Sequence, residues 1–146
     1  MTNDNLFDNA PIIDRYTRKQ AVEDGVLVDV SEWASAGPKG MLGGYLIPVA
    51  VTRAVWEQIL AIPDQYKGIQ DVRGRAHDVL WMSLLASKRI MGRLGDGDAD
   101  MLPVSGLYQV TLHIKGSRKR LQTYKLVLSL GDDGKPVITI MLPDED

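Results

Sequence analysis

The longest stretch with helical hydrophobic periodicity covers residues 74–91. At 100° per residue, its apolar and small side chains share one wide arc, which predicts a helix with a core face. That arc holds Ala76, Val79, Leu80, Ser83, Leu84, Ala86, Ser87, Ile90 and Met91. The opposite arc mixes charged with large apolar residues: Arg75, His77, Asp78, Lys88, Arg89, Trp81, Met82 and Leu85. This mixture predicts a far side that is either covered by a second layer or used for binding.

The last third of the chain alternates with strand periodicity. Residues 108–115 and 123–130 each place apolar side chains at every second position, and residues 137–142 form a third apolar run. Residues 116–119 and 131–134 between them have turn composition. Three strands on short turns predict an antiparallel meander with one apolar face, and the long helix is the natural cover for that face.

Shorter elements are predicted for residues 16–34. Thr17 and Gln20 have the spacing of a capping box, and Gly25 is placed to end the helix that they begin. Residues 26–30 are apolar and β-branched, as expected for a short buried strand. Ser31 is expected to cap a further helical turn.

A second strand and helix are predicted for residues 46–61. Pro48 interrupts the strand candidate at 46–51 and predicts an edge position or a strand end. Thr52 is a suitable N-cap for a helix over residues 53–61. The fold class is therefore α+β: a C-terminal three-stranded antiparallel meander covered by a long central helix, with short helices and one or two short strands in the N-terminal half. We expect a single domain over residues 1–146, with residues 1–10 as a flexible tail.

Composition changes this picture mainly by exclusion. The 146 residues have no cysteine and a net charge of −2, so disulfides, thiolate metal sites and a global basic field are excluded. The N-terminus lacks the basic and apolar regions of a signal peptide. No apolar run reaches the roughly 18 residues of a membrane span. We expect a cytoplasmic protein that binds no membrane.

Two loops suggest ligands but lack the required patterns. The glycine-rich residues 37–44 contain no lysine followed by serine or threonine, which a phosphate-binding loop needs. Asp96, Asp98 and Asp100 alternate like calcium ligands, but Met101 and Leu107 stand where an EF-hand needs glycine and glutamate. We expect a solvated acidic loop, no metal and no cofactor.

A basic hairpin is the first candidate surface. Lys115, Arg118, Lys119, Arg120 and Lys125 surround one predicted turn with no acidic residue among them. They are suited to nucleic-acid phosphates or an acidic protein surface. Alternatively, they protect a hairpin edge from aggregation, which we favour because no aromatic residue interleaves the run.

The second candidate surface consists of Trp81, Met82 and Leu85, with Lys88 and Arg89 as a charged rim. Trp, Met and Arg are enriched at protein interfaces. The short N-terminal elements must nevertheless pack somewhere, which predicts a core position for Trp81 with Leu85 partly exposed beside it.

The chain also resembles an uncharacterised domain-of-unknown-function family of small proteins encoded on plasmids, phages and other mobile elements. The matching blocks include residues 16–18, 24–30, 48–56, 70–71, 74–75 and 78–82, and the most specific one is 131–134 with 136–143. The resemblance supplies no catalytic residues. It implies a setting in which small accessory proteins modulate host defence or the maintenance of the element.

The leading hypothesis is therefore a non-enzymatic accessory protein of a mobile element that binds a macromolecular partner, in the manner of an anti-CRISPR inhibitor of a host immune complex. The rival is a small hydrolase or transferase with a site assembled from Tyr16, Arg53, His77 and Asp78. A nucleic-acid-binding module that uses the hairpin at residues 115–125 is a further alternative.

Overall fold

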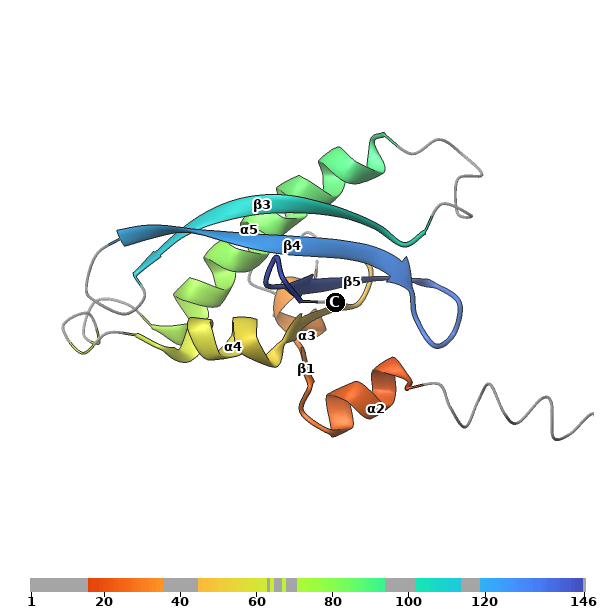
Figure 1. The fold of residues 1–146 in the computed structure, drawn as a ribbon, viewed down its shortest axis with the longest axis horizontal. Helices are drawn as coiled ribbons and strands as arrows, with labels where there is room; N and C mark the ends of the chain where they lie inside the picture. Colours follow the sequence, from red (N-terminus) through yellow and green to blue (C-terminus); the bar gives the residue numbers. More distant parts are fainter. Residues whose placement is uncertain are drawn as a thin grey trace, which may run out of the picture.

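The computed structural model of this chain describes residues 16–35, 45–62, 64, 67, 71–93, 102–113 and 119–145. These residues form an α+β fold with a five-stranded mixed sheet and four helices (Figure 1). The helices are α2 (Arg18–Glu23), α3 (Ser31–Ala34), α4 (Arg53–Leu60) and α5 (Val72–Met91). The strands are β1 (Leu27–Asp29), β2 (Val49–Thr52), β3 (Val104–His113), β4 (Lys119–Leu130) and β5 (Pro136–Met141). The predicted tail, glycine-rich loop and acidic loop fall outside the described residues.

The sheet has the strand order β1-β2-β5-β4-β3. The last three strands pair antiparallel in sequence order, as the alternating pattern predicts. They are not a separate meander, however, because β2 pairs in parallel with β5 and brings β1 with it. The predicted α+β class is therefore confirmed in its coarse form. The two short N-terminal strands, also predicted, belong to the same sheet as the C-terminal strands, which was not predicted.

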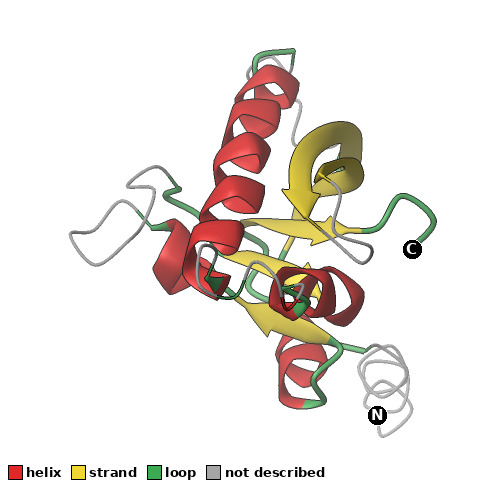
Figure 2. Ribbon diagram, turned by 90° about the vertical axis from the view of Figure 1, so that its left-hand side faces the viewer, coloured by secondary structure: helices red, strands yellow, loops and turns green. Residues whose placement is uncertain are grey.

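One face of the sheet carries the core. Tyr108, Tyr124, Leu126, Ile138 and Ile140 from the three C-terminal strands are buried there. Figure 1 shows α5 crossing behind β3 and β4, and α4 and α3 pack near β2 on the same core. These helices lie side by side in one layer, which Figure 2 shows in red against the yellow strands. The N-terminal elements therefore find their place beside α5 and not on top of it.

The other face is held by α2 and the C-terminal turn. The Arg18 guanidinium donates to Thr139 Oγ1 at 2.6 Å and to the Ile138 carbonyl at 2.7 Å. Thr52 Oγ1 donates to Glu145 Oε2 at 2.7 Å, and the same carboxylate oxygen accepts from the Leu142 amide. Both ends of the described chain are thus fastened to the sheet by polar contacts.

Local signals at the N-terminal half were mostly reliable. Thr17 and Gln20 form the predicted capping box, Gly25 ends the helix with φ +77°, and Thr52 caps α4. The prediction that Ser31 caps a helix is wrong. Ser31 lies inside α3, and its hydroxyl group donates a hydrogen bond to the Val49 carbonyl and accepts one from the Val49 amide. Pro48 immediately precedes β2, which is the strand-end alternative.

Two residues of the long helix were assigned to the wrong arc. Arg75, expected on the polar arc, is 3% exposed because its guanidinium donates to the carbonyls of Ile59 at 2.9 Å and Gln58 at 2.7 Å at the end of α4. Met91, expected in the core, is 46% exposed at the C-terminal end of α5. The remaining residues predicted for the core arc are buried.

Candidate functional site

Helix α5 is fixed at both ends by its own sequence. The Asp71 carboxylate accepts from the Gly74 amide at 2.6 Å and so caps the N-terminus. Lys88 and Arg89 lie in the last turn, where positive charge is favourable to the helix dipole. Between them the buried side chains Val79, Leu80 and Leu84 attach the helix to the sheet. The orientation of the opposite side is therefore also fixed.

The outer face of α5 consists of exposed residues on the side away from the core: Asp78, Trp81, Met82, Leu85, Lys88 and Arg89. Trp81 is 42% exposed, Met82 37% and Leu85 45%. The expectation that Trp81 lies in the core is therefore wrong, whereas the partial exposure of Leu85 is confirmed. Trp81 stacks on His77, with ring centroids 6.3 Å apart and 6° between planes.

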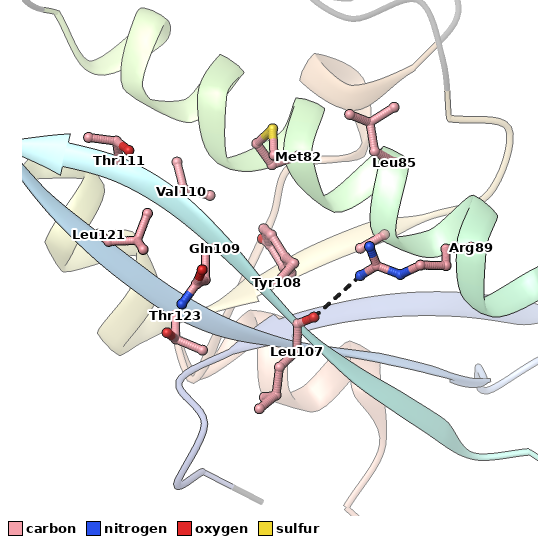
Figure 3. A pocket seen from close by; sticks show the side chains of 11 residues that line it. Met82, Leu85, Arg89, Leu107, Tyr108, Gln109, Val110, Thr111, Leu121 and Thr123 are labelled. Carbon is pink, nitrogen blue, oxygen red and sulfur yellow. Dashed lines mark hydrogen bonds between the residues drawn. The ribbon is translucent and has the colours of Figure 1, made fainter.

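A groove runs between this face and strand β3 (Figure 3). Met82, Leu85 and Arg89 form its helical wall, and residues 107–111 of β3 line the rest together with Leu121 and Thr123 of β4. Figure 3 shows Met82 and Leu85 on the helix above β3, and the contact of Arg89 Nη2 with the Leu107 carbonyl oxygen at 3.5 Å. The groove has a volume of about 840 Å³ and is open to solvent. It extends the apolar surface of the outer face.

Strand β3 contributes to this groove a sheet edge that pairs with no other strand among the described residues. It is the last strand in the sheet order, and residues 104–112 include no charged side chain. The contact with Arg89 shows that the Leu107 carbonyl points away from β4. Since backbone direction alternates along an antiparallel strand, Gln109 and Thr111 also direct their backbone groups outward. Edge strands usually carry charges that prevent association, and this one does not.

The described lining of the groove holds few titratable groups. Arg89 is the one charged side chain among its described lining residues. The Tyr108 hydroxyl donates to the Val79 carbonyl at 3.2 Å, and burial raises the pKa of Tyr108 well above its ordinary value. Neither group resembles a general base, whose pKa should lie near neutrality.

The four residues of the rival enzyme hypothesis fall into two sets. Tyr16 donates to Asp24 at 2.6 Å, and Arg53 donates to the Gly25 carbonyl at 3.1 Å, both at the end of α2. His77 and Asp78 lie together on α5, with Nδ1 and Oδ1 3.6 Å apart. Among the described residues, no hydrogen bond or ion pair joins the two sets. The hydrogen bond to Asp24 raises the pKa of Tyr16, opposite to what an activated tyrosine needs.

Most of the basic hairpin lies outside the described residues. Arg118 is not among them, and for Lys119 and Arg120 only the backbone in β4 is described. Lys125 lies six residues along the strand from Lys119, about 20 Å at strand rise, and its ammonium group donates to the Glu145 carbonyl. Lys125 therefore belongs to the C-terminal attachment and not to the hairpin tip.

Sequence reasoning missed a hollow of about 430 Å³ beside α2, lined by Arg18, Asp29 and Asp132 among others. The charged groups of these three residues are engaged in structural hydrogen bonds, that of Asp29 with the Ser31 amide at 2.9 Å. Burial lowers the pKa of Arg18, whose guanidinium is bonded to β5, and the Asp132 carboxylate accepts the Arg18 and Lys19 amides at 3.0 Å each. The sequence could not indicate that Asp132 accepts amides at the start of α2, because Asp132 and α2 are far apart in the chain.

Two features are absent from the described residues. They contain no group of three or more histidine, aspartate or glutamate side chains placed to hold a metal ion. Within the same stretches, no helix has both the length and the apolar composition that crossing a bilayer requires.

Comparison with protein families assigns the chain to one of them. The chain belongs to a family of unknown function, DUF6573, whose model matches residues 3–146. Neither the curated proteins nor the solved structures gave a match.

Proposed function

We propose, for this member of a family of unknown function, a non-enzymatic protein that binds a macromolecular partner through the outer face of α5. The observation that carries the proposal is the adjacent exposure of Trp81, Met82 and Leu85 on one fixed helix. Single exposed apolar residues are ordinary, but a cluster beside an apolar groove is typical of an interaction surface.

The energetics of this face support a contact role. Fully burying a large apolar side chain contributes about 1.5–3 kcal/mol, so covering three half-exposed ones is a substantial driving force. Asp78, Lys88 and Arg89 surround them, which matches the usual arrangement of an apolar interface centre inside a charged rim. Tryptophan and arginine are also the side chains that most often dominate binding energy.

The kind of partner follows from the resemblance and not from the geometry. An accessory protein of a mobile element that inhibits a host immune complex, as anti-CRISPR proteins do, needs complementary shape and charge and no catalytic group. A helix that presents Trp81 and Leu85 on a rigid core meets that requirement.

The test is affinity capture with two matched charge insertions. Leu85→Asp places a carboxylate at the centre of the face, and Leu130→Asp places one at an equally exposed site on β4. Tagged parent and variants are incubated with host lysate and with purified host immune complexes. We expect a partner that the parent and Leu130→Asp retain and Leu85→Asp loses. Capture that survives Leu85→Asp, or no partner from any of these sources, would contradict the proposal.

A further inference from the structure

Four residues of the outer face form a straight stripe along α5. Asp78, Met82, Leu85 and Arg89 follow one another at intervals of four, three and four residues. At 100° per residue they fall within an arc of about 60° and extend about 16 Å along the helix. All four are exposed. This is the spacing of a coiled-coil seam, with an acid at one end, a base at the other and two apolar residues between.

The stripe is complementary to itself when reversed. The pair Asp78 and Arg89 and the pair Met82 and Leu85 share one midpoint, between Ser83 and Leu84. A two-fold axis through that midpoint sets a second α5 antiparallel to the first. Asp78 then lies opposite Arg89 of the other copy, Met82 lies opposite Leu85, and each contact occurs twice. An isologous interface requires such self-complementarity.

We propose that, when no host partner is bound, the outer face of α5 binds a second copy of this chain through an antiparallel α5–α5 contact about this two-fold axis. The inference rests on the proposed function, since it uses the same contact face. A different partner would not require the acid and the base to stand at equal distances from one centre.

The neighbouring groups are compatible with this pairing. The two-fold axis stands perpendicular to the plane of the two helices, so equivalent residues of the two copies lie on the same side of that plane. The two Trp81 side chains therefore lie on one side, about 7.5 Å apart along the helices. The two β3 edges lie on the other side, without charges between residues 104 and 112.

Among the described residues, Asp78 lies 3.6 Å from His77 Nδ1 and Arg89 lies 3.5 Å from the Leu107 carbonyl oxygen. Asp78 also interacts electrostatically with the buried guanidinium of Arg75. Both side chains are exposed and can therefore reach a second copy.

A stripe about 16 Å long on a helix about 10 Å wide covers on the order of 160 Å². Stable complexes bury about 800 Å² per partner. We therefore expect a dimer that dissociates on dilution. Sedimentation velocity of the full chain, from about 1 µM to about 200 µM, spans the dissociation constants of weak dimers. The parent should shift from one chain to two over this series.

Charge exchange separates self-pairing from every other contact. Asp78→Arg places two arginines opposite each other, and Arg89→Asp places two aspartates opposite each other, twice in each dimer. Each single variant should raise the dissociation constant about tenfold or more. The double variant Asp78→Arg/Arg89→Asp restores both pairs with reversed polarity and should return to the parent's value. Circular dichroism confirms folding of these surface variants.

The outcomes are distinct. A parent that stays monomeric throughout, or a double variant that dissociates as readily as the single ones, overturns the inference. Neither result affects the proposed function, which is tested separately by loss of host-partner capture in Leu85→Asp. Recovery in the double variant supports self-pairing, because a heterologous partner would meet two wrong charges.

Discussion

Leu80 and Trp81 are adjacent on α5 but point into different environments. Leu80 is 1% exposed, whereas Trp81 is 42% exposed. Leu80→Ala should lower the free energy of unfolding by about 2–5 kcal/mol, because it leaves a core cavity. Trp81→Ala should change it by less than about 1 kcal/mol, since little packing is lost. Urea denaturation of both variants measures the difference. Equal destabilisation would mean that Trp81 is a core residue.

At this scale, periodicity predicted the buried arc of α5 but not its exceptions. Arg75 is buried because two carbonyls at the end of α4 accept its guanidinium, and a contact between separate elements leaves no periodic signal. Trp81 is exposed because it lies on the side of α5 opposite the buried residues. The two other tryptophans, Trp33 and Trp56, pack against the core from α3 and α4, with their ring centroids 5.8 Å apart. Tryptophan content alone does not indicate which of the three stays outside.

At the scale of elements, the end of α2 depends on a left-handed residue. Gly25 has φ +77°, and an added Cβ would lie 2.9 Å from Arg53 Nη1. Gly25→Ala should therefore destabilise the fold by about 1–2 kcal/mol. Gly25→Asn should cost less than alanine, because asparagine tolerates this conformation better. Thermal denaturation compares the two variants. An alanine variant as stable as the parent would contradict the assigned conformation.

Elements with local signals were predicted well, and pairings between distant segments were not. The capping box at Thr17 and the cap at Thr52 depend on residues three positions away. The parallel pairing of β2 with β5 joins Val49 to Ile138, and nothing in either segment specifies that neighbour. The exposed edge of β3, and with it the groove beside α5, follows from this strand order. Half of the candidate surface was therefore inaccessible from sequence, whereas Trp81, Leu85, Lys88 and Arg89 were identified.

At the scale of the whole molecule, buried tyrosines should limit stability at high pH. Burial raises the pKa of Tyr124 to about 12, partly offset by Arg75, and burial raises the pKa of Tyr108 and Tyr45 as well. The unfolded chain ionises its tyrosines near pH 10. The stabilisation from keeping them protonated is therefore complete below about pH 10 and is lost as pH rises toward about 12.

The expected slope is up to about 1.4 kcal/mol per pH unit for each such tyrosine. Urea denaturation at a series of pH values above about pH 9 measures it. Tyr124→Phe removes one titrating group and should give a shallower slope, although it also loses the hydrogen bond from Tyr124 to Gln58 at 2.8 Å. An unchanged slope in this variant would contradict the assigned role of Tyr124.

The central claim, that the outer face of α5 is a contact surface, is tested most directly by site-specific photocrosslinking. The photoreactive residue p-benzoylphenylalanine replaces Leu85 in one variant and Leu130, which is similarly exposed, in another. Both are irradiated in cells that carry the chain. We predict an adduct from position 85 and none from position 130, with a mass of two chains if the partner is a second copy. Absence of an adduct at position 85, or equal adducts at both positions, would contradict the account.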